Sequence, residues 1–268
     1  MRHIVFALTL TLGAAGCATT GPNKGQFNLI SMDQERAMGK QFDQQLRTEK
    51  KVIDDPQTVA YLQGLSDRLM KGAPDSPIKS FHVRVVVDPA VNAFAAPGGQ
   101  LYVNSGLVKA AANESELAGV MGHEMGHGVQ RHVTEQLSKI YGLELLTGFA
   151  LGQNPGIAQQ LVAQLGGQVV ALKFSRDAER EADKLAVRYT SAARIDPNGL
   201  VTFFEKLQKQ EGKSPPEYVG WLSTHPLTKD RIRDAELRVA KVDRRGMEVD
   251  SPAFHAFRDQ LFGRVASR

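Results

Sequence analysis

Residues 114–131 constrain this chain more than any other segment, because they have the pattern of one strong helix that carries two histidines four positions apart. These are His123 and His127. Positions four apart share a helix face, so the two imidazoles can converge on one ion. Glu124 is rotated off that face by one residue and stays close enough to reach a water beside the ion. This HExxH arrangement predicts two zinc ligands with a carboxylate general base between them.

The rest of this helix also favours a metal site. Leu117, Val120 and Met121 give the helix an apolar back, which disfavours the alternative of two surface histidines on a solvated helix. Catalytic zinc usually takes three protein ligands and leaves a fourth position for water. His132 is the nearest further histidine, but its spacing matches no usual third ligand. The metzincin pattern fails because Val133 stands where that pattern needs a histidine.

A second acidic helix offers carboxylates for the remaining ligand. In Glu179-Arg180-Glu181-Ala182-Asp183, the first and last residues are four apart and share a face. One of the two can bind zinc while the other holds a ligand histidine in place. We interpret Glu181 as part of a solvated helix face.

Apolar periodicity elsewhere predicts a mostly helical chain with a small sheet. Alternation in Phe81–Val87 predicts a strand, Asn92–Pro97 a second extended piece, and Gly98-Gly99 a turn into Leu101–Val103. Helical spacing covers residues 33–48, 56–71, 178–192, 197–209 and 228–242, and a Leu-, Ala-, Gly- and Gln-rich region at 137–172 also looks helical. Many helices around one small sheet indicate a single α+β domain over residues 31–268.

Composition excludes several other classes of protein. The chain has 268 residues, of which 42% are hydrophobic and 23% charged, and this is the mix of a folded globular protein. The net charge is only +4 and the basic residues are scattered, so we expect no nucleic-acid partner. No stretch of 18 or more apolar residues follows the N-terminus, which excludes a polytopic membrane protein.

The N-terminal segment is predicted to direct the chain to the cell envelope. A short basic segment, Met1-Arg2-His3, precedes an apolar run at 4–12, which is too short to span a bilayer and suits a cleaved signal peptide over residues 1–16. The single cysteine, Cys17, rules out an internal disulfide framework. Its position resembles the lipobox of bacterial lipoproteins, although Ala14 stands where leucine is usual; an ordinary signal peptide with a stray cysteine is the alternative. We expect residues 17–30 to be a lipid-anchored tether. Ala18, in place of aspartate, resembles lipoproteins sent to the outer membrane of Gram-negative bacteria.

These segments together resemble the M48 family of zinc metallopeptidases, in its periplasmic lipoprotein branch. The matching segments, in family order, are Asn92–Gly99, His123–His127, Ser175-Arg176 with Glu179–Asp183, and Thr224–Pro226 followed by Arg231-Ile232. The resemblance implies a zincin-like fold, one zinc ion per chain, Glu179 as the third ligand and Asp183 as the acid behind a ligand. It places His225 and Arg231 along the active site. Some members carry a helical-repeat domain after this region, and we expect none here because the chain ends at Arg268.

The function implied by this resemblance is that of a zinc endopeptidase, with Glu124 as the base that takes the proton of the attacking water. Either His225 or Arg231 can add a donor to the developing oxyanion. The extended piece is expected to offer a strand edge to which the substrate adds as another strand, the alternative being an ordinary edge strand. The residues expected to bind substrate in this way are Asn92, Ala93, Phe94 and Ala95. Such recognition of backbone suits unfolded or misassembled envelope proteins, by resemblance outer-membrane proteins, in the periplasm.

A second class of function stays open, namely a zinc-bound chaperone or assembly factor whose proteolysis is gated or silent. His225 motivates it, because an imidazole in the fourth zinc position would displace the water. Proline disfavours a helical conformation at the preceding residue, so Pro226 predicts that His225 lies in an extended turn with its side chain free to enter the cleft. A purely structural role beside Pro226 is the remaining alternative for His225. Glu124 favours catalysis, since a pure binding site needs no base beside the metal.

Overall fold

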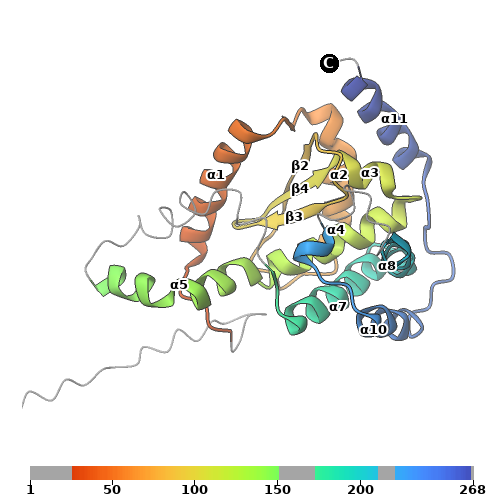
Figure 1. Cartoon of the computed structure of the whole chain (residues 1–268). Coiled ribbons are helices and arrows are strands. Elements are labelled where there is room, and N and C mark those ends of the chain that lie inside the picture. Colours follow the sequence, from red (N-terminus) through yellow and green to blue (C-terminus); the bar gives the residue numbers. More distant parts are fainter. Residues whose placement is uncertain (1–25, 151–172, 211–220, 267–268) are drawn as a thin grey trace, which may run out of the picture.

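The computed structural model describes residues 26–150, 173–210 and 221–266 of the chain, and Figure 1 shows helices arranged around one small sheet. The elements in chain order are α1 (Met32–Glu49), β1 (Val52–Ile53), α2 (Pro56–Met70), β2 (His82–Val86), β3 (Ala93–Ala96), β4 (Gln100–Asn104), α3 (Ser105–Ala110), α4 (Glu114–Val129), α5 (His132–Ala150), α7 (Arg176–Ala192), α8 (Asn198–Gln210), α10 (Lys229–Val239) and α11 (Pro252–Ala266). The predicted α+β class, mostly helical with a small sheet, is confirmed.

The four strands form one mixed sheet in the order β1-β2-β4-β3. Strands β2 and β4 are parallel, with His82 opposite Gln100, whereas β1 and β3 pair antiparallel to β2 and β4 respectively. The turn between β3 and β4 contains Gly98 and Gly99 at φ of 73° and 79°, a backbone region that glycine adopts without a steric penalty. The predicted hairpin is therefore confirmed, and it leaves β3 at one edge of the sheet among the described residues.

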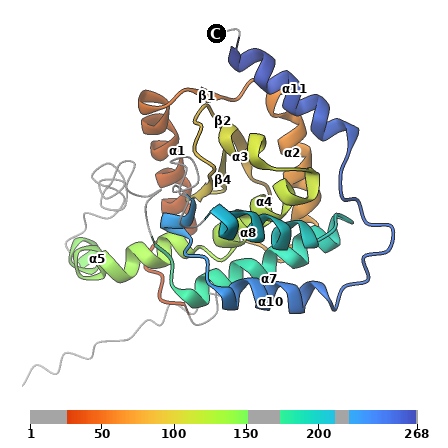
Figure 2. The same cartoon turned by 45° about the vertical axis from the view of Figure 1, so that its right-hand side comes forward.

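Each face of the sheet packs against different helices, because side chains alternate along a strand. In β4, Tyr102 belongs to a smaller core with Phe42 of α1, where the two ring centroids are 5.7 Å apart. Its neighbours Leu101 and Val103 point to the opposite face and join the main core with α2 and α4. Figures 1 and 2 show α1 on one side of the sheet and α4 on the other.

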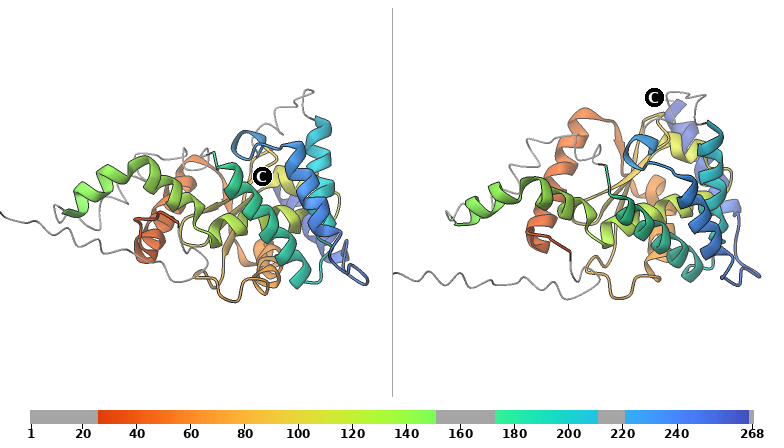
Figure 3. Two further views of the ribbon diagram at one scale, coloured as in Figure 1. Left: turned by 90° about the horizontal axis from the view of Figure 1, so that it is seen from below. Right: turned by 60° about the horizontal axis from the view of Figure 1, so that its bottom comes forward.

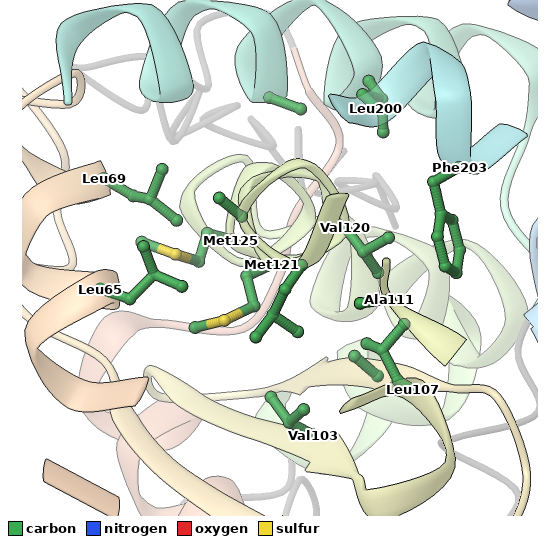
Figure 4. Packing of buried hydrophobic residues seen from close by; sticks show 14 of the residues in the cluster. Leu65, Leu69, Val103, Leu107, Ala111, Val120, Met121, Met125, Leu200 and Phe203 are labelled. Carbon is green, nitrogen blue, oxygen red and sulfur yellow. The ribbon is translucent and has the colours of Figure 1, made fainter. Parts of the chain in front are cut away.

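Helix α4 lies at the centre of the main core, and every one of its residues is buried. Figure 4 looks along this helix and shows α2, β4, α3 and α8 contributing side chains around it. Helix α7 lies along another side of α4, and the two backbones come close where α4 has glycines. A Cβ added at Gly126 would lie 3.1 Å from Cα of Ala182, and one at Gly122 would lie 3.3 Å from Cα of Ala186. This close approach brings the acidic side chains of α7 to the histidines of α4.

The predicted helices and strands are found within a few residues of their expected ends, and three short or weakly patterned elements were not predicted. These are β1, α3 and α11. Helix α5 covers the start of the predicted helical region at 137–172, is kinked at Tyr141 and projects from the body of the protein in Figure 3. Residues 151–172 and the predicted signal peptide with Cys17 lie outside the described residues. Among the helices that the structure describes, none is long and apolar enough to cross a membrane.

Candidate metal centre

The HExxH residues lie in the last two turns of α4, deep inside the protein. Asn113 caps the N-terminus of this helix, because its side-chain oxygen accepts a hydrogen bond from the backbone N–H of Glu116 at 3.0 Å. His123, Glu124 and His127 are each at most 1% exposed. Buried polar side chains of this kind need partners, because loss of hydration without replacement contacts is costly.

Asp183 on α7 holds the first histidine. Its Oδ1 lies 2.8 Å from Nδ1 of His123, and since an ionised carboxylate only accepts hydrogen bonds, Nδ1 carries the proton. The lone pair of His123 is therefore on Nε2. Arg231 fixes Asp183 in turn through two hydrogen bonds of 2.8 Å, from Nε to Oδ2 and from a terminal N–H to Oδ1. A carboxylate behind a ligand histidine is a usual companion of metal sites.

Four buried side chains bring one potential ligand atom each to a common point. They are His123, His127, Glu179 and His225, and their ligand atoms all lie within 4.8 Å of one another. Nε2 of His123 is 3.1 Å from Nε2 of His127 and 3.3 Å from Nδ1 of His225. The carboxylate of Glu179 lies 3.5 Å from His123, 3.4 Å from His127 and 2.9 Å from His225.

The chemistry and spacing of these four groups fit zinc. Zinc binds imidazole nitrogen and carboxylate oxygen at about 2.0–2.1 Å in a tetrahedron, which puts neighbouring ligand atoms about 3.3 Å apart. The contacts given above, of 2.9–3.5 Å, are close to that value, and all four ligand atoms lie within 4.8 Å of one another. In addition, the lone pair on Nε2 of His123 faces the other three groups, an arrangement that a cation between them would stabilise. The four side chains therefore offer enough donor atoms to hold one zinc ion.

Burial and neighbouring charges keep His127, Glu179 and Asp183 in the forms that a metal site requires. Burial lowers the pKa of His127 well below its ordinary value, so the imidazole is neutral and able to coordinate. Burial alone would raise the pKa of Glu179, but the charge and hydrogen bonds of His225 and His127 outweigh it, and the net shift is downward. Burial alone would also raise the pKa of Asp183, but the hydrogen bonds from Arg231 outweigh it and the pKa is lowered. Both carboxylates are thus ionised.

The predicted base, Glu124, lies beside this cluster and contacts the segment that carries His225. Its Oε1 accepts a hydrogen bond from Nε1 of Trp221 at 3.2 Å and lies 3.5 Å from Nε2 of His225. Burial alone would lower the pKa of His225, but the charges of Glu124 and Glu179 outweigh it and the pKa is raised. The Trp221 indole stacks on His225, with ring centroids 4.9 Å apart and planes at 23°.

The structure places His225 at a bend between two helical segments, and its side chain reaches the site. Residues 221–224 are helical, and the N–H of His225 donates to the carbonyl of Trp221 at 2.9 Å. His225 therefore lies at a bend directly after a helical turn, and Pro226 follows where the helix cannot continue. Its side chain is 2% exposed.

Arg231 lies behind the ligands rather than beside Glu124. Its guanidinium contacts Asp183, the carboxylate of Glu179 at 2.6 Å and the carbonyl of Pro226 at 3.0 Å. These contacts engage each of its three nitrogens. The geometry therefore favours a positioning role, and a donor role toward an oxyanion stays a prediction.

Two side chains that sequence reasoning had not assigned to the site contact His127. The ring of Phe174 stacks on it at 4.1 Å with planes at 28°, and Nδ1 of His132 lies 2.9 Å from its Nδ1. Phe174 immediately precedes Ser175, the N-cap of α7, and a hydrophobic residue at that position often packs inward; this was the signal available in the sequence. Glu181, interpreted from the sequence as solvated, is partly exposed and lies 3.4 Å from His132.

The expected substrate-binding strand lies close to the end of the metal-site helix. A Cβ added at Gly128 of α4 would lie 3.5 Å from Cβ of Ala95 in β3. Ala93 and Ala95 are buried, Phe94 is half-buried, and Asn92 just before the strand is buried. On its inner side β3 pairs with β4, and no described strand pairs with its outer side.

Comparison with known proteins finds metallopeptidases. The model of peptidase family M48 matches residues 56–239. The chain is 33% identical over 237 residues to the beta-barrel assembly-enhancing protease of Escherichia coli strain K12, and this alignment covers 84% of this chain and 48% of that protein. It is also 30% identical over 217 residues to the mitochondrial metalloendopeptidase OMA1 of Schizosaccharomyces pombe, covering 80% of this chain and 64% of that protein. The chain thus spans about half the length of the bacterial relatives it matches.

Proposed function

Because this chain belongs to peptidase family M48, we propose that it is a zinc-dependent endopeptidase that hydrolyses peptide bonds in unfolded or misassembled envelope proteins. The observation that carries the proposal is the buried convergence of His123, His127 and Glu179 beside the carboxylate of Glu124. Three protein ligands and an adjacent base are the usual composition of a hydrolytic zinc site.

Each side chain has a distinct task in this mechanism. His123, His127 and Glu179 would hold a zinc ion, which would supply polarisation of the substrate carbonyl and a water whose pKa is lowered to about 7. Glu124 takes the proton of the attacking water and passes it to the leaving amine. Asp183 holds the proton on Nδ1 of His123, which directs the lone pair of Nε2 into the site. Arg231 orients both acidic side chains of α7 through its contacts with Asp183 and Glu179.

Substrate recognition is proposed to use the outer edge of β3. An extended peptide can add to a free sheet edge through backbone hydrogen bonds, which do not depend on its side chains. The position of Ala95 next to Gly128, one residue after His127, supports this route because it puts the strand beside the metal-site helix. Recognition of backbone selects chains that lack their own folded structure.

The proposed substrates and location follow from the relatives and the N-terminal segment. The bacterial relatives are named beta-barrel assembly-enhancing proteases, so we propose that outer-membrane proteins are among the substrates of this chain. Lipidation at Cys17 would hold the protein in the periplasm, at the outer membrane of a Gram-negative bacterium. Two or more acyl chains give stable anchoring, whereas a single chain is marginal.

The decisive experiment compares wild type with Glu124→Gln on an unfolded substrate such as casein, with zinc content measured in both. We expect about one zinc per chain in each protein, chelator-sensitive cleavage by wild type, and loss of cleavage by at least about a hundredfold in the variant. Glu236→Gln on the exposed side of α10 is a matched control and should behave as wild type. Full cleavage by Glu124→Gln would refute the role of this base.

A second function is favoured by one specific observation, the nitrogen of His225 in the fourth ligand position. In that position it excludes the attacking water, as expected of a zinc-bound chaperone or assembly factor with gated or silent proteolysis. The same variant separates the two functions. A binding role survives Glu124→Gln, measured as retained suppression of aggregation of an unfolded outer-membrane protein, whereas a proteolytic role does not.

A further inference from the structure

The far side of the His127 ring faces another histidine rather than a carboxylate or a carbonyl. Nδ1 of His127 and Nδ1 of His132 are 2.9 Å apart, and both side chains are at most 2% exposed. On its other side, Nε2 of His132 lies 3.4 Å from a carboxylate oxygen of Glu181. The three groups form a row that runs from the metal cluster to the partly exposed side chain of Glu181.

The positions of the protons along this row follow from the chemistry of the imidazole ring. The two Nδ1 atoms point away from the four clustered ligand atoms, so no cation lies between them and they share one proton, because two N–H groups would repel and two lone pairs would leave both unsatisfied. Nε2 of His127 faces the other three ligands, so its lone pair is on that atom and its proton is on Nδ1. His132 must then accept at Nδ1 and carry its own proton on Nε2, which faces Glu181.

We infer that His132 is a positioning residue that fixes the ring orientation and the coordinating tautomer of His127, with Glu181 selecting the tautomer of His132. The inference rests on the proposed zinc site. His132 would accept the hydrogen bond from Nδ1 of His127, as Asp183 accepts the one from Nδ1 of His123, but the acceptor is an imidazole nitrogen instead of a carboxylate. Ligand histidines generally need such a partner on the second nitrogen.

The backbone between α4 and α5 explains how a residue only five positions later can reach back to His127. Helix α4 ends at Val129, and Arg131 adopts φ of 57°, a left-handed conformation that is unusual for a residue other than glycine. A buried ion pair of 2.6 Å between Arg131 and Glu35 of α1 stabilises this corner. Helix α5 then begins at His132, so the corner turns that side chain toward the helix it has just left.

The ring of His127 is held by a stacking contact on its face as well as by the contact at Nδ1. Phe174 stacks on it at 4.1 Å and also contacts His132, with ring centroids 6.2 Å apart. Packing alone therefore restricts the tilt of the ring, but it does not distinguish the two tautomers. Only an acceptor at the position of Nδ1 of His132 does so.

The test uses substitutions that differ in where they place an acceptor. In His132→Asn the side-chain oxygen takes the place of Nδ1, whereas in His132→Gln it moves out to the place of Nε2, and His132→Leu has no acceptor. We measure the zinc dissociation constant of the full chain by competition with a chelator, and the rise in melting temperature that zinc produces. His255→Leu removes a histidine that is paired with Asp250 at a distance from the site, and is the matched control.

We expect zinc affinity to fall about 10- to 100-fold in His132→Leu and His132→Gln, with a smaller thermal shift on adding zinc. His132→Asn and His255→Leu should stay within about threefold of wild type. If His132→Leu does not fold, the comparison of the Asn and Gln variants still decides, because both are polar and similar in size. Equal affinity in these two variants would overturn the inference. Wild-type protein that binds no zinc would overturn the proposed function itself, and this outcome is seen before any variant is made.

Discussion

Replacement of His225 by alanine tests whether this side chain holds the enzyme in a closed state or assists the reaction. The imidazole supplies the fourth potential ligand atom and lies 3.5 Å from the oxygen of Glu124. While the ring is there, the attacking water cannot take the fourth ligand position. If His225 is inhibitory, wild type is active only in the fraction of molecules in which the ring has moved out. Alanine at this position removes that restriction.

The structure sets a lower limit on the size of the effect. The His225 ring stacks on Trp221 at 4.9 Å and lies 5.6 Å from the ring of Phe174. Such aromatic contacts contribute about 0.5–1.5 kcal/mol each, so displacing the ring costs about 1 kcal/mol or more before any contact of its nitrogens is counted. A difference of about 1 kcal/mol corresponds to roughly a fivefold change in rate.

We therefore expect kcat/KM of His225→Ala on an unfolded protein substrate to rise at least about fivefold, with zinc content unchanged at about one per chain. His82→Ala, at an exposed position of β2, is the matched control and should leave the rate unchanged. A fall of about a hundredfold would refute the inhibitory role and identify His225 as a donor to the oxyanion. An unchanged rate would refute both roles and leave His225 a structural residue.

Three further predictions concern the metal, the anchor and the fold. Glu179→Gln should lose stoichiometric zinc, measured by metal analysis, because a three-ligand site is severely weakened by the loss of one ligand; full zinc and full activity would show that another residue is the third ligand. Cys17→Ser should release the protein from the membrane fraction of cells, and an unchanged distribution would refute lipidation. Glu35→Gln should lower the free energy of unfolding in urea by about 3 kcal/mol, because it leaves Arg131 charged and buried without its partner. Addition of Arg131→Met should recover part of that loss, and a single-variant effect below about 1 kcal/mol would contradict the assignment.

The parts of the site that could be predicted from the sequence are those whose spacing is set by one helix. His123 and His127 share a face of α4 and Glu179 and Asp183 share a face of α7, because residues four apart are neighbours on any helix. That the two faces meet depends on the close approach of α4 and α7, which the glycine at 126 permits. Local periodicity alone leaves that meeting undetermined, and the family resemblance supplied it.

The residues that support His127 could not be predicted, for a different physical reason. His132 reaches back because Arg131 is left-handed, and nothing in the local sequence indicates positive φ at an arginine. The buried partner of Arg131 at this corner is Glu35, which lies almost a hundred residues earlier in the chain, so local sequence carries no sign of it. Short elements such as β1, of two residues, are similarly below the length at which alternation can be recognised.

The contacts of Trp221 connect the two sides of the proposed mechanism. Its indole N–H donates to the carboxylate of Glu124, and its ring stacks on His225, so one side chain touches both the base and the group that occupies the fourth ligand position. A movement of residues 221–225 that withdraws His225 must also break or lengthen the hydrogen bond to Glu124. That movement would leave the carboxylate oxygen of Glu124 that now accepts from Trp221 free to accept a proton instead. Opening the fourth position and freeing this oxygen would therefore be consequences of one displacement, so the proposed closure by His225 and the proposed proton transfer by Glu124 are compatible in a single site.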